Sequence, residues 1–417
     1  MHAVGAGALT AQPRCREHLA GVADPGRVEA PDTLTEVSAL LGGTTGTLLV
    51  RGAATKLDWA GRVTDPDLVV DTAALQGMLT HNPADMTASV RAGTPLQVLQ
   101  ETLAEEGQWL ALDPPSASVG ATVGGLLAAG DSGPSRLRYG GLRDLVIGVT
   151  LVLADGTPAR AGSHVIKNVA GYDLSKLVHG SLGSLAVIAE VIVRLHPRPP
   201  ASATAVGPAD AAQATAATLA LAASPLEPTA IEWVSGDGTE TGQLHVRVDG
   251  TTASTEAASR GVADLLAGLG IPTEVLSEPA ADNAWKAHAT AVLGTDDETV
   301  VRVAGLPSDL DALARHVSEA AAQAGVGARV ISSAALGMHT VRLDGGSAQA
   351  HAHVLTGLRT YARAKDASVL LRQRPAALDD LVDALGPPPS SIELLRRVKA
   401  QFDPTGRFAP GRFRPWY

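Results

Sequence analysis

Glycines gather in one stretch of the chain, between Leu112 and Leu195, in a pattern that suits phosphate binding. Short apolar segments separate them, and they stand at Gly120, Gly124, Gly125, Gly130 and Gly133. Glycine lets the backbone approach a ligand closely and adopts left-handed turns at little steric cost. Exposed N–H groups in such turns form concave sites for anions, above all phosphate. The pattern predicts a large phosphorylated cofactor along this backbone; on composition alone, a tightly packed strand–helix region is the alternative.

Four short motifs occur in a fixed order around this stretch. The first, Arg51–Lys56, follows the apolar segment TLLV, and the second is Ala121-Thr122-Val123-Gly124-Gly125. The third is Lys167-Asn168-Val169-Ala170-Gly171-Tyr172-Asp173, and the fourth runs from Gly180 to Ile188. Any one of these motifs is a weak signal, whereas four in order are a strong one.

In this order the motifs resemble the FAD-binding domain of the vanillyl-alcohol oxidase and D-lactate dehydrogenase superfamily. Within it they are most similar to the family of FAD-binding subunits of bacterial glycolate oxidases. The resemblance covers about residues 40–200 and the closing segment SSIELLRRVKAQFDPTGRFAPGRF, and it is weak over 201–385. It implies an α+β fold: a two-subdomain FAD-binding domain of the PCMH type, then an α/β cap domain with an antiparallel sheet. A closing helix then returns to the FAD-binding domain.

The resemblance implies FAD as the cofactor. Superfamily members that attach flavin covalently use a His in the first loop, sometimes with a Cys in the second. Here Lys56 and Leu57 follow Thr55, and the single cysteine, Cys15, lies far upstream, so we expect non-covalent FAD. The residues expected to bind it are Arg51, Gly52, Ala53, Ala54, Thr55, Lys56, Asp113, Pro114, Gly120, Ala121, Thr122, Gly124, Gly125, Gly130, Ser132, Gly133, Gly183, Val187 and Ile188.

The sequence departs from the family pattern in two of these motifs. Ala53 and Ala54 replace glycines of the family loop, and alanine disfavours positive φ. Residues 180–186 read Gly-Ser-Leu-Gly-Ser-Leu-Ala where the family commonly has Gly-Ser-Glu-Gly-Thr-Leu-Gly. Both departures leave flavin binding expected but put its affinity in doubt.

No catalytic base can be identified from the sequence. Lys167 and Tyr172 of the third motif could reach a substrate, although a lysine at such a position more often contacts the cofactor or supports the structure. Arg136, Arg138 and Arg143 could pair with phosphate or carboxylate groups, because arginine forms bidentate contacts. A surface position is the alternative, and we prefer it for at least two of the three.

A metal site is not expected. The hydroxy-acid-oxidising subunits of such complexes carry a His-x-Gly-Asp-Gly-Asn-x-His motif, which this sequence lacks. His351 and His353 are a close histidine pair, but the surrounding residues favour a helix, on which positions i and i+2 point to different sides. Solvated or capping histidines are expected instead.

The resemblance therefore implies the FAD-binding subunit of a glycolate oxidase complex, with a hydroxy-acid-oxidising subunit and an iron–sulfur subunit as partners. Two alternatives stay open. One is a free-standing FAD-dependent dehydrogenase of another small hydroxy acid or alcohol, and the other is a flavin-fold scaffold without turnover.

Composition excludes other classes. The 417 residues carry a net charge of −10 without a basic run, which argues against nucleic-acid binding. One cysteine excludes a disulfide framework within the chain. No apolar run reaches the roughly 18 residues of a transmembrane helix, and the start lacks the pattern of a signal peptide. We expect a cytoplasmic protein, peripheral to a membrane only through partners.

Apolar periodicity and turn signals predict the elements that position the motifs. Strands are expected at 47–50, 68–70, 88–92, 146–153, 157–161, 185–195, 231–234, 244–248, 300–303 and 340–343, and helices at 31–41, 94–106, 208–223, 255–269 and 309–324. Because proline cannot continue a central strand ladder, His196–Pro200 predicts a domain boundary. The expected units are an N-terminal segment 1–30, an FAD-binding domain 31–200, a cap domain 201–385, and a closing helix with an aromatic tail 386–417. Five of the twelve aromatic residues fall after position 401, so we expect this tail to pack against another part of the protein.

Overall fold

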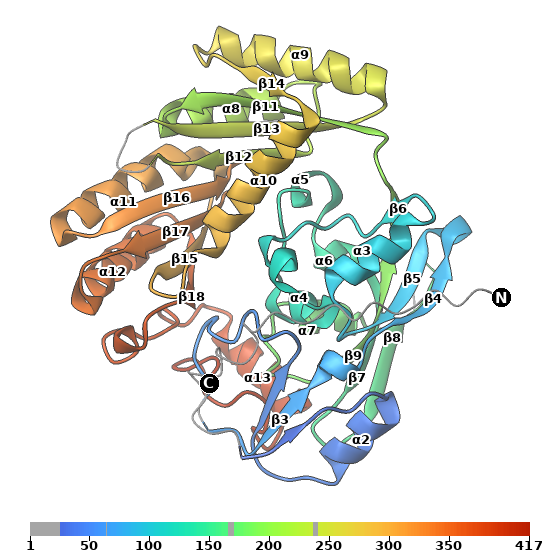
Figure 1. Cartoon of the computed structure of the whole chain (residues 1–417). Helices are drawn as coiled ribbons and strands as arrows, with labels where there is room; N and C mark the ends of the chain where they lie inside the picture. Colours follow the sequence, from blue (N-terminus) through green and yellow to red (C-terminus); the bar gives the residue numbers. More distant parts are fainter. Residues whose placement is uncertain (1–25, 64, 166–170, 237–240) are drawn as a thin grey trace.

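The strands of the chain form four sheets in a computed structural model that describes residues 26–63, 65–165, 171–236 and 241–417. Cys15 and residues 167–170 of the third motif lie outside these ranges. Figure 1 shows two parts, one built around an eight-stranded sheet and one that combines the smaller sheets.

A small parallel sheet delivers the first motif. It has the order β1 (Val28–Glu29), β3 (Leu68–Asp71), β2 (Leu48–Arg51), and helix α2 (Leu34–Gly42) packs against it. Thr33 caps α2 by accepting a hydrogen bond from the backbone N–H of Glu36, while the Glu36 carboxylate accepts one from the backbone N–H of Asp32. Because β2 ends at Arg51, the predicted loop begins directly at the edge of the sheet.

An antiparallel sheet of five strands carries the remaining motifs. Its order is β4 (Met78–Asn82), β5 (Thr87–Arg91), β9 (Val187–Arg194), β7 (Val146–Val152), β8 (Pro158–Gly162). The helices of this region are α3 (Leu96–Ala104), α4 (Val123–Ala129), α5 (Arg136–Tyr139), α6 (Leu142–Leu145) and α7 (Leu174–Val178). The 3₁₀ helix η4 (Pro115–Val119) leads into α4, and the short strands β6 (Gln108–Trp109) and β10 (His196–Pro197) pair with each other.

The C-terminal half contains an antiparallel sheet of eight strands in the order β14-β11-β13-β12-β16-β17-β15-β18. The strands are β11 (Ala201–Ala209), β12 (Ala230–Val234), β13 (Gly242–Gly250), β14 (Glu274–Leu276), β15 (Thr299–Ala304), β16 (Gly327–Ser333), β17 (Met338–Asp344) and β18 (Ser368–Gln373). The helices are α8 (Ala211–Ala222), α9 (Thr252–Gly268), α10 (Glu278–Leu293), α11 (Leu310–Ala324) and α12 (Ala348–Ala364).

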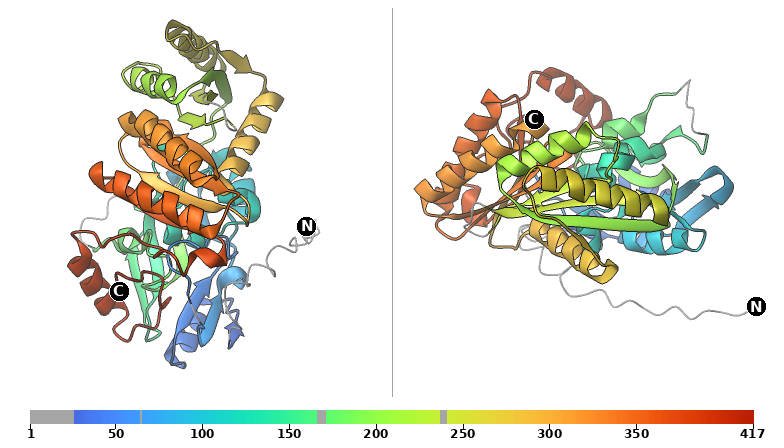
Figure 2. Two further views of the ribbon diagram at one scale, coloured as in Figure 1. Left: turned by 90° about the vertical axis from the view of Figure 1, so that its left-hand side faces the viewer. Right: turned by 90° about the horizontal axis from the view of Figure 1, so that it is seen from above.

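The two faces of this sheet differ in chemistry because side chains alternate along a strand. One face packs against α8, α9, α11 and α12 through apolar residues such as Trp233, Val246 and Val301. The opposite face carries polar residues from the intervening positions: Glu232, His245, Arg247, Asp249, Arg302, Arg342 and Arg372. Figure 2 shows the four helices along the outer side of the sheet. The polar face is therefore the one turned toward the FAD-binding motifs, with α10 lying across part of it.

The predicted helix over 208–223 is wrong at its start. Residues up to Ala209 extend β11, and α8 begins at Ala211, with Asp210 and Gln213 forming a reciprocal capping box. Pro208 lies opposite Gln243 of β13, and on the other side of β11 it lies beyond the pairing with β14, which covers only Thr204–Val206. In the C-terminal half the prediction also missed α10 and strands β14, β16 and β18.

The closing segment returns to the N-terminal half, as predicted. Helix α13 (Ile392–Phe402) contacts the N-terminal half: Lys399 Nζ donates to Ser184 O at 2.8 Å, and Phe402 packs against the core of the five-stranded sheet. Phe408 is buried with Leu48 and Val37, and its backbone bridges to Leu48. Asp403 holds the turn that follows the helix by accepting hydrogen bonds from the backbone N–H groups of Arg407 and Phe408.

Candidate functional site

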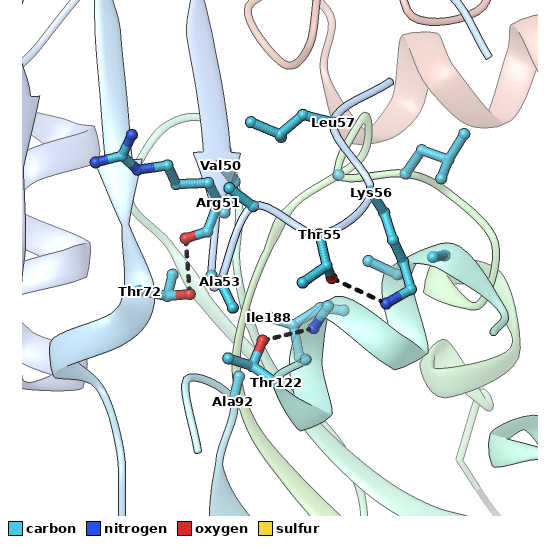
Figure 3. Close-up of a pocket in the computed structure, with 18 of the residues that line it drawn as sticks. Val50, Arg51, Ala53, Thr55, Lys56, Leu57, Thr72, Ala92, Thr122 and Ile188 are labelled. Atoms are coloured by element: carbon cyan, nitrogen blue, oxygen red, sulfur yellow. Dashed lines mark hydrogen bonds between the residues drawn. The ribbon is translucent and has the colours of Figure 1, made fainter. Parts of the chain in front are cut away.

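A cleft of about 710 Å³, called the main cleft below, lies where the loop after β2 meets α4 and the start of β9 (Figure 3). Most of the predicted cofactor residues line it, namely Arg51, Gly52, Ala53, Ala54, Thr55, Lys56, Thr122, Gly124, Gly125, Gly183 and Ile188. The structure thus brings together residues of the first, second and fourth motifs. Other lining residues were not among the expected cofactor residues, for example Thr72, Ala92, Leu182 and Arg412.

The remaining predicted residues lie outside the lining of the main cleft. Ser132 and Gly133 line a neighbouring cavity instead. Asp113 binds Ser135 and Arg247, and Val187 is buried in the core of β9. Pro114, Gly120, Ala121 and Gly130 belong to the turns around η4 and α4, where Gly120 and Gly130 take positive φ at helix ends. These glycines serve local turns and not the wall of the cleft.

The loop after β2 offers unoccupied backbone donors to the cleft. The N–H groups of residues 53–56 donate to no other described residue. Ala54 has a φ of 57°, which is a left-handed conformation. The glycine expected at this position from the family pattern would adopt it without strain. At Gly52 an added Cβ would lie 2.4 Å from Thr122 Oγ1, so only glycine lets this loop approach α4 so closely. A run of free N–H groups around a left-handed residue is the geometry of an anion site.

The turn at Thr122 has a different role from the predicted one. The N–H groups of Val123, Gly124 and Gly125 are all occupied, by Thr94 O, Ala92 O and Thr122 Oγ1. An added Cβ at Gly124 would lie 2.6 Å from the Ala92 Cβ, so this glycine allows close packing. Gly125 faces the cleft, where an added Cβ would meet only Thr122 Oγ1 at 3.0 Å. The turn therefore shapes the cleft and does not supply donors to it.

Two cationic side chains of the first motif are already paired within the protein. Arg51 forms a two-pronged contact with Asp71, at 2.9 Å from Nε and 2.8 Å from Nη2, so its guanidinium points away from Thr55 (Figure 3). Lys56 Nζ donates to Ser116 Oγ at 2.9 Å and lies 3.4 Å from Asp131. Burial lowers the pKa of Lys56, although Asp131 opposes the shift.

Arg412 is a lining residue that comes from the far end of the chain. Its Nη1 donates to the carbonyl oxygens of Leu57, Trp59 and Gly61 at 2.5, 2.9 and 2.9 Å. Burial lowers its pKa to about 10. The guanidinium thus holds in place Leu57, Trp59 and Gly61, which follow the first motif. The closing Pro-Gly-Arg segment was identified in the sequence, but nothing there showed that its arginine reaches the cleft.

A second cavity of about 370 Å³ lies between the FAD-binding motifs and the polar face of the eight-stranded sheet. From the first half of the chain it is lined by Pro115, Ser132, Gly133 and Pro134, and from the second half by Glu232, His288, Val292, Arg302, Ile331, Ser333, Met338, His339, Thr340 and Arg372. Asp131 connects it to the main cleft, because this buried carboxylate lies 3.4 Å from Lys56 and 3.7 Å from Arg372. Burial alone would raise the pKa of Asp131, but Lys56 and Arg372 together lower it.

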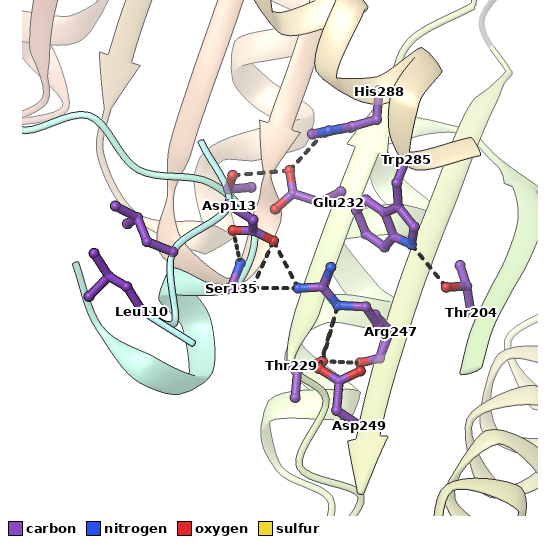
Figure 4. A network of polar contacts seen from close by, with 12 residues as sticks. Leu110, Asp113, Ser135, Thr204, Thr229, Glu232, Arg247, Asp249, Trp285 and His288 are labelled. Atoms are coloured by element: carbon purple, nitrogen blue, oxygen red, sulfur yellow. Dashed lines mark hydrogen bonds and ion pairs between the residues drawn. The ribbon is translucent and has the colours of Figure 1, made fainter. Parts of the chain in front are cut away.

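Polar contacts join the two halves beside this cavity (Figure 4). Arg247 Nη2 donates to Asp113 at 3.0 Å and to Ser135 Oγ at 2.7 Å. The Arg247 guanidinium carbon lies 4.9 Å from the centroid of the Trp285 ring. Glu232 accepts a hydrogen bond from Ser333 Oγ at 3.0 Å and lies 3.0 Å from His288 Nε2. Burial raises the pKa of Glu232, although His288 opposes the shift.

The other candidate residues lie apart from both sites. Tyr172 is 90% exposed, and Arg138 and Arg143 are exposed, with Arg138 2.9 Å from Glu227. Arg136 donates to Ser132 at 3.3 Å. The expectation of solvated or capping histidines is wrong for His351, which is buried between Thr299 Oγ1 and Gly345 O, whereas His353 is exposed.

Comparison with known proteins gives these sites a context. Residues 25–162 match the family described as FAD binding domain. Over 155 residues the chain is 38% identical to glycolate oxidase subunit GlcE of Escherichia coli (strain K12), a match that covers 37% of this chain and 44% of that protein. Over 425 residues it is 29% identical to the Uncharacterized FAD-linked oxidoreductase Rv2280 of Mycobacterium tuberculosis, covering 93% and 90%. The chain thus spans less than half of the glycolate oxidase subunit that it matches.

Solved structures share the fold over nearly the whole chain. p-Cresol methylhydroxylase aligns with a TM-score of 0.70 at 14% identity, covering 93% of this chain and 88% of that one. Xylooligosaccharide oxidase from Myceliophthora thermophila C1 aligns with a TM-score of 0.66 at 16% identity, covering 92% and 90%. Among the described residues, no helix is long and apolar enough to cross a membrane. The match over residues 25–162 and the FAD-linked relatives therefore indicate an FAD-dependent oxidoreductase, and the solved structures show that the chain shares the fold of p-cresol methylhydroxylase.

Proposed function

We propose that this oxidoreductase holds FAD non-covalently in the main cleft and oxidises a small 2-hydroxy acid, glycolate first among them, to the 2-oxo acid. We further propose that it works in a complex with a hydroxy-acid-oxidising subunit and an iron–sulfur subunit. The observation that carries this proposal is the junction of three motifs around one cleft within the matched FAD-binding domain.

The residues of the main cleft fit a dinucleotide. The free N–H groups of residues 53–56 would hold its pyrophosphate, and the bare backbone at Gly52 and Gly125 leaves room beside it. Apolar side chains such as Leu57, Leu182 and Ile188 supply surface for the rings. Neither histidine nor cysteine is among the lining residues, which supports dissociable binding.

When bound, the flavin accepts the hydride, and the protein supplies position and electrostatics. The remaining requirements are a cation for the substrate carboxylate and an acceptor for the hydroxyl proton. The second cavity holds groups of both kinds, and Asp131 links it to the main cleft through Lys56. This adjacency supports a substrate site beside the cofactor.

Non-covalent FAD is tested by acid precipitation of the purified protein. The supernatant should turn yellow and show the spectrum of FAD. Flavin that stays in the pellet would contradict dissociable binding. A colourless protein that added FAD cannot load would remove the basis of the whole proposal.

The partner requirement rests on the likeness to GlcE and on the absence of the histidine-rich metal motif from the sequence. A free-standing dehydrogenase is the second candidate. It is favoured by the near full-length match to the mycobacterial FAD-linked oxidoreductase and by the chain's own charged cavity.

Anaerobic mixing of FAD-loaded protein with glycolate or D-lactate separates the two candidate functions. Bleaching of the flavin absorption only after partner subunits are added supports the complex, and rapid bleaching of the isolated chain supports the free-standing enzyme.

A further inference from the structure

The second cavity contains more positive charge than the protein itself compensates. Lys56, Arg302 and Arg372 all act on Asp131, and Asp131 is the one acidic group that influences the pKa of either arginine among the described residues. Burial lowers the pKa of Arg372 to about 9 and also lowers that of Arg302. Three cations around one carboxylate leave an excess of positive charge in a buried place.

The two arginines also have unused hydrogen-bond donors. Arg302 Nη1 and Arg372 Nε are buried without a hydrogen-bond partner in the part of the chain that the structure describes. Arg342, on the same face of the sheet, shows the usual alternative: its Nε and Nη2 lie 3.0 and 2.5 Å from Glu298, and Nη1 donates to Ala291 O. Buried arginines are normally paired in this way, so the unpaired donors at Arg302 and Arg372 need an explanation.

The backbone places Arg372 for this purpose. In the pairing of β15 with β18, Val301 lies opposite Leu371 and Val300 opposite Gln373, so Arg372 is the extra residue of a β-bulge. Bulges redirect a side chain and are common beside active sites. The Trp59 ring lies 4.0 Å from the Arg372 guanidinium and 6.0 Å from that of Arg302, which limits their orientation. The two groups are thus held at the cavity wall before any ligand arrives.

The remaining ionisable pair of the cavity does not cancel this charge. Glu232 and His288 lie 3.0 Å apart and are both buried. Burial raises the pKa of Glu232, which favours its uncharged form over a carboxylate that could compensate the arginines. The cavity therefore still requires an anion.

We infer that Arg302 and Arg372 bind the carboxylate of a small organic acid, which supplies the missing negative charge. Guanidinium groups match a carboxylate through paired N–H donors, and Arg302 and Arg372 both line the second cavity. Taking this acid to be the substrate rests on the proposed function. Arg302 and Arg372 are then the residues that select acids over alcohols of the same size.

Calorimetric titration with oxalate, a two-carbon acid that has no hydroxyl group to oxidise, tests the inference. FAD-loaded full-length protein should bind oxalate, and neutral glycolamide should not bind. Arg302→Met and Arg372→Met should each weaken oxalate binding by roughly tenfold or more, since each removes a charged donor from the carboxylate. Arg315→Met is the matched control, because this arginine is 67% exposed and forms a surface ion pair with Asp311, and it should leave the affinity unchanged.

Melting temperature without ligand provides a second readout that a merely structural arginine would not give. Arg302→Met should raise it, because an uncompensated buried cation is removed, whereas Arg342→Met should lower it by leaving Glu298 unpaired. If Arg302→Met does not fold, Arg302→Lys replaces it in the binding experiment. This variant keeps the charge but loses the paired N–H donors, so it should bind oxalate more weakly than the parent protein.

The outcomes separate this inference from the proposed function. Protein that binds FAD but not oxalate, or arginine variants that bind oxalate as tightly as the parent, would overturn the carboxylate site alone. Protein that binds oxalate through both arginines but cannot be loaded with FAD would overturn the proposed function and leave the anion site standing.

Discussion

The main cleft is shaped by the backbone, whereas the second cavity is shaped by charged side chains. In the main cleft, free N–H groups at 53–56 and bare glycines at 52 and 125 create the space, and Arg51 is turned away toward Asp71. In the second cavity, Arg302 and Arg372 line the wall, and each has a buried N–H donor without a hydrogen-bond partner among the described residues. Ligand binding at a backbone site should tolerate changes of side-chain charge but no added volume. Ligand binding at a charged site should be lost when a charge is removed and should depend less on added volume.

The largest expected effect is at Gly125, where the comparison depends on shape. Gly125→Val adds a branched side chain at the wall of the main cleft, and we expect FAD affinity to fall roughly a hundredfold because overpacking of this kind costs about 1–3 kcal/mol. Fluorescence titration with FAD measures it. Gly268→Val is the matched control, since an added Cβ there meets open space. Normal FAD content in Gly125→Val would show that the cofactor lies elsewhere. Gly124→Val is less informative because its Cβ would strike Ala92 and disturb the fold itself.

Arg412 tests whether a charged residue can support the backbone site from a distance. Arg412→Ala leaves the carbonyl groups of Leu57, Trp59 and Gly61 without their donor. We expect a loss of about 2 kcal/mol in the free energy of unfolding and roughly tenfold weaker FAD binding. Urea unfolding and FAD titration measure the two effects. Arg414→Ala, two residues away and exposed, should change neither; equal effects of both substitutions would argue against a specific role for Arg412.

Acid should weaken the half of the molecule that carries the charged cavity. Burial lowers the pKa of His245 and His339 to about 4, below the value of 6.5 in an unfolded chain. A depressed pKa contributes stability that is present above pH 6.5 and lost as the pH falls toward 4. Between pH 6.5 and 5 we expect a loss of about 1–2 kcal/mol per histidine.

Urea unfolding at these two pH values measures the loss. His245→Gln and His339→Gln should each reduce the difference between them, and His353→Gln, an exposed position, should not. An unchanged pH dependence in both buried variants would mean that these imidazoles do not resist protonation in the folded protein.

Ala54 gives the smallest effect and tests strain within the backbone site. Its φ of 57° costs alanine about 1–2 kcal/mol, and glycine removes this strain at an entropic cost of about 0.5–1 kcal/mol. Ala54→Gly should therefore stabilise the protein by at most about 1 kcal/mol, measured by thermal unfolding. Ala53→Gly is the control, because Ala53 is not among the residues with positive φ and should lose stability. A loss of stability in Ala54→Gly would show that the loop is not strained there.

The sequence alone pointed to the residues of the main cleft. Apolar periodicity predicted the strand before Arg51, the resemblance implied Gly52 and Gly125 as cofactor residues, and the structure brings these motifs together at one cleft. The expectation that failed there, donors at the turn of Thr122, concerned which N–H groups are already used. That depends on Ala92 and Thr94 of the preceding strand region, and no local pattern reveals it.

Within the predicted strands 231–234, 244–248 and 300–303, Glu232, Arg247 and Arg302 lie on the face opposite the apolar one, because successive side chains point to opposite sides. The sequence by itself could not decide what that polar face meets. Only the tertiary structure set it against Ser132 and Gly133, inserted a bulge at Arg372 and left Asp131 as the shared counter-ion. Burial and charge balance arise between segments that are distant in the chain, so they are properties of the folded molecule and not of any motif.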